Sequence, residues 1–216
     1  MSLEGLKRNG HRLELGNFEL YGEYGIPILQ PAQLDSRLNW LRFNHSLKAK
    51  ERTDCGVHFF IDDYLFERAW HDPPRYALFL HRFAAVMAPD FSMFTDYPKA
   101  VQVYNHWREH QLGAYWQSMG MTVIPTIGWL DKDSYSWCFD GEPMHSTVAV
   151  SSVGTQKNQD SKRLFLDGYN EMMVRLQPTK IIFFGAVPKE CTGNIEHHSP
   201  YYETFTHRLD FSMNER

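Results

Sequence analysis

Carboxyl and hydroxyl groups follow two short apolar runs of this sequence. Asp62 and Asp63 close the run that begins V-H-F-F-I, and Asp90 and Ser92 follow the run A-V-M-A. Two carboxyl groups in one pocket push their pKa values apart, so that one can act as base or nucleophile and the other as acid. We therefore interpret Asp62, Asp63 and Asp90 as candidate catalytic residues. No motif predicts a cofactor, although the same oxygen ligands suit Mg²⁺.

Other polar or aromatic side chains follow later apolar runs, and one arginine interrupts the apolar stripe of a predicted helix. Hydroxyls, glycine amides and a Trp ring suit a small polar ligand with a flat group. The candidate ligand-binding residues are Ser92, Arg108, Thr126, Trp129, Ser151, Ser152 and Gly154. Structural interpretations stay open beside these. Asp62 and Asp90 could cap the following helices, and Arg108 could belong to a buried ion pair.

Several common types of site lack support in this sequence. No G-x-G-x-x-G follows a predicted strand, G-x-S-x-G is absent, and the stretch S-S-V-G-T from Ser151 has no Walker lysine. His197 and His198 are adjacent, so they point apart on a regular element, and Cys191 belongs to no ligand spacing. We therefore predict no metal site made of His or Cys.

Short apolar runs alternate with longer helical patterns along the chain. The predicted strands are 57–62, 85–91, 122–129, 147–152 and 180–186, and the predicted helices begin at Pro73, near Thr95 or Asp96, and near Asp160. This alternation predicts an α/β fold with a mostly parallel sheet of five or six strands. We expect a partial or complete barrel-like arrangement, with an open doubly wound sheet as the alternative. In either arrangement the strand ends meet on one face, where ligands bind.

The chain of 216 residues shows no repeat or long linker, which predicts one domain. We place an N-terminal arm at 1–24, a single α/β domain at 25–187 and a C-terminal tail at 188–216 that packs on the domain or extends from it. The net charge of −4 argues against a general nucleic-acid binder. Three distant cysteines, no apolar leader and no apolar run of about 18 residues favour a cytoplasmic protein without a membrane segment.

Six motifs resemble a bacterial and phage family catalogued as a domain of unknown function. They are VHFFIDDYLFERAW, APDFSMFTDYP, LGAYWQSMGMTVIPTIGW, CFDGEP, VAVSSVGT and FLDGYNEM, and the likeness covers residues 25–185. This resemblance implies a role in a phage or mobile element and assigns no catalytic residue. The order of motifs is also loosely similar to the barrel of base-exchanging transglycosylases, whose zinc-binding cysteine cluster is missing here.

Two classes of function follow from these features. The first is an enzyme that acts on a nucleotide, nucleoside or sugar-like ligand through the carboxylates at the strand ends. The second is a non-catalytic binding protein that captures a small ligand, a host or phage protein, or a nucleic acid, because the 15% aromatic content exceeds what a core needs. The sequence leaves the choice between enzyme and binding protein open.

Overall fold

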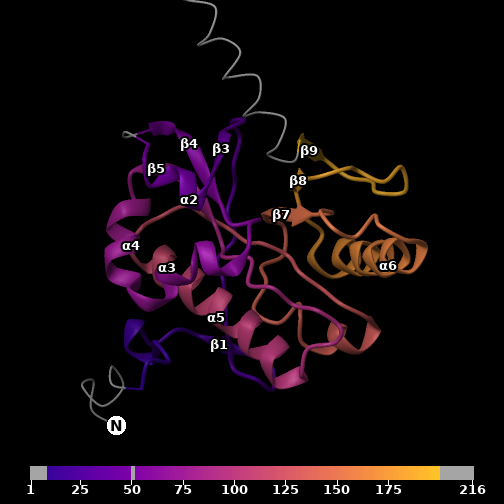
Figure 1. The fold of residues 1–216 in the computed structure, drawn as a ribbon, viewed down its shortest axis with the longest axis horizontal. Coiled ribbons are helices and arrows are strands. Elements are labelled where there is room, and N and C mark those ends of the chain that lie inside the picture. Colours follow the sequence, from indigo (N-terminus) through magenta and orange to yellow (C-terminus); the bar gives the residue numbers. More distant parts are fainter. Residues whose placement is uncertain (1–8, 50–51, 200–216) are drawn as a thin grey trace, which may run out of the picture.

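The computed structural model describes residues 9–49 and 52–199, which form an α/β fold (Figure 1). The strands are β1 Leu20–Tyr21, β2 Ile26–Pro27, β3 Asn39–Arg42, β4 Arg52–His58, β5 Phe83–Met87, β6 Val123–Ile124, β7 Thr147–Ser151, β8 Lys180–Phe184 and β9 Ile195–His198. The α-helices are α2 Phe43–Ser46, α3 Glu67–His71, α4 Pro73–Leu80, α5 Lys99–Ser118 and α6 Gln159–Leu176. Short 3-10 turns lie at η1 Leu13–Leu15, η2 Asp63–Leu65 and η3 Lys132–Ser136.

Two parallel sheets replace the single sheet of five or six strands that the sequence predicted. Strands β3-β4-β5-β6 form one sheet and β7-β8-β9 form the other, while β1 and β2 make a separate antiparallel pair. One isolated parallel bridge, between Thr126 and Ala149, connects the edge of the first sheet to β7. Within the described residues, the two sheets do not close into a barrel. The mostly parallel α/β character is confirmed.

Both faces of the central strands are buried, which explains why their sequences are almost continuously apolar. Alternate residues of β5 and β8 point to opposite faces. One set forms a core shared by the two sheets and contributed by several strands: Ala85, Met87, Ile124, Ala149, Ile182 and Phe184. The other set packs under helices: Val57 and Val86 lie under α4 and α5, and Ile181 and Phe183 lie under α6. The prediction of helices that alternate with buried strands is therefore confirmed.

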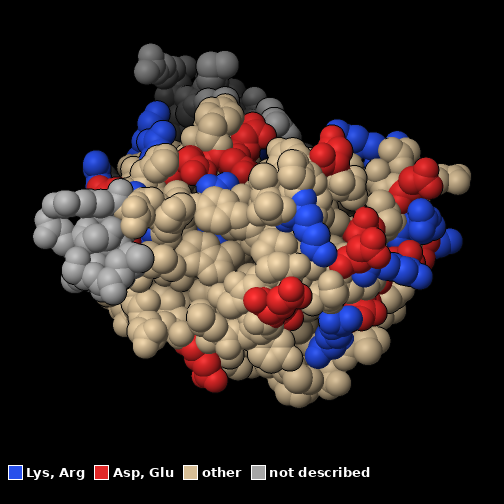
Figure 2. Space-filling model, turned by 90° about the horizontal axis from the view of Figure 1, so that it is seen from below, with Lys and Arg blue, Asp and Glu red and all other residues tan. Residues whose placement is uncertain are grey.

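The three longest helices begin close to their predicted starts. Helix α4 begins at Pro73. Proline lacks an N–H, but an amide in the first turn of a helix has no acceptor within the helix, so no hydrogen bond is lost. Helix α5 begins after Pro98, so neither Thr95 nor Asp96 is its N-cap. Helix α6 begins after Asn158, whose side chain accepts a hydrogen bond from the Ser161 amide at 2.8 Å. Charged side chains of both signs gather over α6, at the right of Figure 2, where Arg163 and Arg175 pair with nearby acids.

Four strand assignments differ from the sequence prediction. The first predicted strand begins at Arg52 rather than Val57 and ends at His58, and the third is only two residues long. Strands β3 and β9 were not predicted, and β9 lies inside the segment that was expected to be a tail.

In the N-terminal arm, Arg12 Nε donates a hydrogen bond to the Trp70 carbonyl at 2.7 Å. Residues 1–8 of the arm and 200–216 of the tail lie outside the described residues.

Among the described residues, the helices are too short or too polar for any of them to cross a bilayer. The side chains of Cys55, Cys138 and Cys191 are all buried.

Candidate functional site

A cavity of about 570 Å³ lies at the carboxyl ends of the parallel strands. Four of its walls are the segments that directly follow β4, β5, β6 and β7, and the first two turns of α6 close one side. These wall residues are Phe60–Asp62, Asp90–Thr95, Ile127–Leu130, Ser151, Val153–Thr155, Ser161, Leu164 and Phe165. The cavity therefore occupies the place where ligands bind in parallel α/β folds.

Six of the ten predicted site residues line this cavity: Asp62, Asp90, Ser92, Trp129, Ser151 and Gly154. The other four lie behind its walls: Asp63, Arg108, Thr126 and Ser152. Thr126 Oγ1 donates to the Ala88 carbonyl at 2.8 Å, and Ser152 Oγ donates to the Ala186 carbonyl at 2.7 Å. These two hydroxyls hold strand-end loops in place.

Neither aspartate that lines the cavity caps a helix. Asp62 precedes η2, but its side chain makes no capping hydrogen bond. The next helix after Asp90 is α5, and its N-cap is Pro98. Neither side chain therefore makes the capping hydrogen bond that the sequence left open, and both residues line the cavity.

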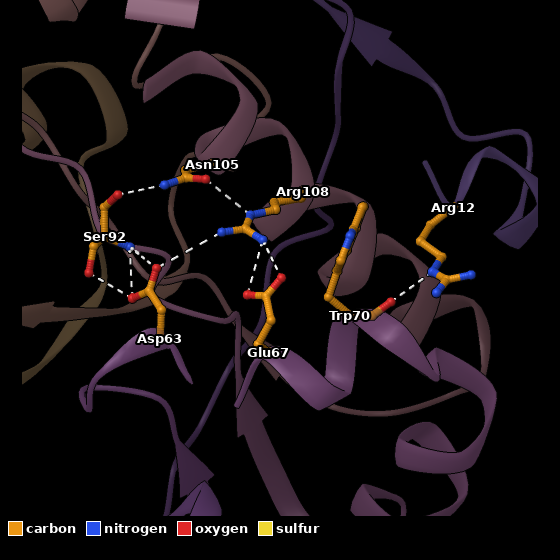
Figure 3. A network of polar contacts seen from close by, with 7 residues as sticks. All are labelled: Arg12, Asp63, Glu67, Trp70, Ser92, Asn105 and Arg108. Atoms are coloured by element: carbon orange, nitrogen blue, oxygen red, sulfur yellow. Dashed lines mark hydrogen bonds and ion pairs between the residues drawn. The ribbon is translucent and has the colours of Figure 1, made fainter. Parts of the chain in front are cut away.

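Asp63 anchors the loop that follows β5 (Figure 3). Its carboxylate accepts hydrogen bonds from Ser92 Oγ at 2.6 Å and from the Ser92 amide at 3.1 Å. From the other side, Asn105 Nδ2 donates to the Ser92 carbonyl at 2.6 Å. Ser92 is thus fixed between the loop after β4 and helix α5, and the negative charge of Asp63 is fixed with it.

Arg108 is the cation of this network. Its Nη1 donates to both carboxylate oxygens of Glu67, at 2.8 and 3.1 Å, and its Nη2 lies 3.9 Å from Asp63. The guanidinium also lies 3.7 Å from the centre of the Phe91 ring, a cation–π contact, and donates to Asn105 Oδ1 at 3.1 Å. Arg108 therefore forms the ion pair that the sequence left open, although the pair is partly rather than fully buried. Arg108 positions the wall of the cavity and does not line it.

Among the residues that line the cavity, Asp90 has a carboxyl group with a strongly raised pKa. Burial, and to a smaller extent the negative charge of Asp63, together raise the pKa of Asp90 to about 7. A carboxyl group with this pKa is present in both protonation states at neutral pH. It can therefore give or take a proton, which an ordinary aspartate does poorly at that pH.

Basic and aromatic side chains complete the lining. Arg42, from the end of β3, and Lys157, just before α6, supply positive charge. Gly154 has φ +85°, a conformation that lets the loop after β7 turn sharply beside the N-terminus of α6. Trp129 supplies the largest flat surface and packs against Phe165, with ring centres 5.3 Å apart. The lining thus combines two carboxyl groups, two cations and an indole.

Trp129 is held by contact with the bare backbone of Gly168 in α6. A Cβ atom at Gly168 would lie 2.0 Å from Trp129 Cδ1, so Gly168→Ala must displace the indole. We expect this substitution to destabilise the fold by about 1–3 kcal/mol in urea unfolding, because the crowding outweighs the better helix propensity of Ala. Adding Trp129→Leu should recover part of the loss, whereas a stabilising Gly168→Ala would show that the indole moves freely.

Sequence reasoning missed a second group of polar side chains, which lies away from the cavity. His106 and His110 on α5 and Glu142 after η3 place one ligand-type atom each within 4.8 Å of the others. The spacing H-x-x-x-H on a predicted helix was the available signal, because it puts both rings on one face. The third member, Glu142, is 32 residues beyond His110 and could be found only from the fold.

Comparison with known proteins shows that the chain is similar to phage proteins. A model of the family described as "Domain of unknown function (DUF4417)" matches residues 18–201. The gene 1 protein of Mycobacterium phage L5 is 40% identical over 170 residues, which cover 78% of this chain and 74% of that protein. The gene 1 protein of Mycobacterium phage D29 is 41% identical over 130 residues, which cover 60% of this chain and 48% of that relative. No solved structure matches the chain. The resemblance inferred from the six motifs is confirmed.

Proposed function

This chain belongs to the DUF4417 family, and we propose that its strand-end cavity binds a nucleotide-, nucleoside- or sugar-like ligand on which Asp90 acts as an acid–base catalyst. The observation that carries this proposal is the carboxyl group of Asp90, which lines the cavity and has its pKa raised to about 7. Carboxyl groups with strongly shifted pKa values cluster at catalytic sites.

The other lining groups define the class of ligand. The Trp129 indole offers a stacking surface for a base or for the apolar face of a sugar. Lys157 and the loop amides near the start of α6 suit an anionic group such as a phosphate. A volume of about 570 Å³ accommodates a ligand of nucleotide size. Mg²⁺ would accompany a phosphorylated ligand at the cavity carboxylates.

In this mechanism Asp90 exchanges a proton with the reacting atom of the ligand. Burial and the fixed charge of Asp63 keep that proton available at neutral pH, and Asp62 is the second carboxyl group in the lining. Once a substrate is known, Asp90→Asn should lower kcat by about 10²–10⁴-fold while KM changes little, because Asn has the same shape and cannot transfer the proton.

A thermal-shift panel of nucleotides, nucleosides, sugars and sugar phosphates, with and without Mg²⁺, tests the ligand class. A ligand at roughly a hundred times its Kd should stabilise the folded chain by about 2.7 kcal/mol. Trp129→Ala and Lys157→Ala should each abolish the shift. Trp107→Ala is the control, because Trp107 lies outside this cavity. A wild-type chain that responds to no member of the panel would contradict the proposal.

A non-catalytic binding protein is the second candidate. It is favoured by exposed apolar side chains around a shallow depression formed by Leu13, Tyr24, Val103, Tyr104 and Trp107. Such a surface suits a host or phage macromolecule. For this function Asp90→Asn would leave activity in a partner-capture assay unchanged, and Trp107→Ala would weaken capture.

A further inference from the structure

Two histidines and a glutamate form a closed polar cluster between α5 and the turn that follows η3. His106 and His110 lie four residues apart on α5 and are 1% and 0% exposed, and the Glu142 side chain is 0% exposed. The two imidazole rings are 4.4 Å apart between centres. Polar groups buried this deeply need partners that satisfy them.

The hydrogen bonds of the two histidines fix where their protons lie. His110 Nδ1 is 2.8 Å from the Pro27 carbonyl, and His106 Nε2 is 3.0 Å from the Asp140 carbonyl. A carbonyl can only accept, so each of these nitrogens carries a hydrogen and the other ring nitrogen of a neutral imidazole has a lone pair. A histidine that donates one N–H to a backbone carbonyl is the usual arrangement in metal sites.

Two of the remaining acceptor atoms of the cluster lie next to each other. His110 Nε2 lies 3.0 Å from Glu142 Oε1, although both atoms are acceptors when the imidazole is neutral and the carboxyl is ionised. Glu142 Oε2 and Glu109 Oε1 are buried and have no hydrogen-bond partner among the described residues. Uncompensated carboxylate oxygens are costly in the interior, so a cation among them would remove a large penalty.

We propose that His106, His110 and Glu142 bind a Zn²⁺ ion that fixes helix α5 to the Asp140–Glu142 turn. Two imidazole nitrogens and carboxylate oxygens are a donor set that Zn²⁺ prefers. Ligand atoms at about 2.1 Å from one ion lie at most about 4.2 Å apart. The three ligand atoms now lie within 4.8 Å of one another, so small side-chain rotations would bring them to the spacing that one ion requires.

The site is structural rather than catalytic. The spacing H-x-x-E-H from His106 to His110 also occurs on the helix of one class of metallopeptidase. Here, however, the three ligand side chains and Glu109 do not line the strand-end cavity, so substrate has no approach to the ion from that side. The three ligand side chains are also buried, and a metal position closed off from solvent is typical of structural zinc. The ion would join this turn to α5, which itself contacts β2 through the hydrogen bond from His110 to the Pro27 carbonyl.

The test uses the full-length chain without a histidine tag. We expect about one equivalent of Zn²⁺ per chain by mass spectrometry of the metal content, and a lower Tm after treatment with a chelator that Zn²⁺ restores. Glu142→Gln and His110→Ala should each weaken Zn²⁺ binding at least about tenfold in a chelator competition. His58→Ala is the matched control, because His58 is equally buried and lies outside the cluster. Its Zn²⁺ affinity should equal that of the wild type.

Cobalt substitution keeps the proposal testable if these variants do not fold. Wild-type chain loaded with Co²⁺ should show the visible absorption of a tetrahedral site with nitrogen and oxygen ligands and without a thiolate charge-transfer band. A wild-type chain that takes up no Zn²⁺ or Co²⁺ would overturn the proposal. A thiolate band, or a Glu142→Gln variant that binds Zn²⁺ as tightly as His58→Ala, would also overturn it. None of these results depends on the role of Asp90.

Discussion

Asp90→Asn should make the folded chain more stable than the wild type at pH 8, and the difference should shrink at pH 5. The native pKa of Asp90 is raised to about 7, whereas an unfolded aspartate titrates near ~3.9. Between these values the native chain holds a proton that the unfolded chain has released, so stability falls as pH rises through this window. Asn does not titrate. The stability advantage of the variant should therefore grow by about 2 kcal/mol between pH 5 and pH 8.

Urea unfolding at several pH values measures this difference. Asp160→Asn, at an exposed position on α6, is the matched control and should follow the wild-type curve. A constant difference between Asp90→Asn and the wild type across this range would show that Asp90 titrates no differently in the folded and unfolded chains. The acid–base proposal would then lose its main support.

Arg108→Ala should produce the largest loss of stability among single substitutions near the cavity. The Arg108 side chain is 11% exposed and compensates two carboxylates, Glu67 and Asp63. Removing one partner of a fully buried pair typically costs about 3–5 kcal/mol, but the Glu67 and Asp63 side chains are 30% and 27% exposed, so water compensates part of their charge. The substitution also removes the cation–π contact with Phe91. We expect the free energy of unfolding from urea titrations to decrease by about 2–3 kcal/mol.

Two further variants show whether the loss comes from this geometry. Arg108→Lys keeps the charge and loses the two-pronged contact with Glu67, so its loss should be intermediate. Arg163→Ala removes an arginine that is 62% exposed and pairs at 3.7 Å with Asp167, and it should change stability by less than about 1 kcal/mol. Equal effects of Arg108→Ala and Arg163→Ala would contradict the network.

Periodicity predicted those elements that bury a regular apolar face. Helix α6 and strands β7 and β8 were found from sequence because their packing residues recur at helical or continuous spacing. Strand β9, with sequence I-E-H-H, is an edge strand whose residues are partly or fully exposed, so it has no apolar pattern. Strand β4 begins with the polar stretch R-T-D, and its true start depends on pairing with β5, which local sequence does not encode.

The candidate site was predicted in its location and only partly in its chemistry. The rule that ligands bind at the ends of parallel strands identified six cavity residues, Asp90 and Trp129 among them. The rule could not distinguish Asp90, which lines the cavity, from Asp63, which lies behind the cavity wall and helps to raise the pKa of Asp90. Contacts such as Arg108 with Glu67, 41 residues apart, depend on how α3 and α5 pack, and local sequence carries no signal for them.

The central claim, that the cavity contains an acid–base carboxyl group, is tested most directly by titrating Asp90 itself. Carbon-13 NMR of aspartate carboxyl groups, assigned by comparison with Asp90→Asn, reports the protonation of this side chain as pH changes. We predict a midpoint at about pH 7, and a shift of that midpoint when a ligand from the thermal-shift panel is added. A midpoint near ~3.9, the value of an ordinary aspartate, would contradict the account.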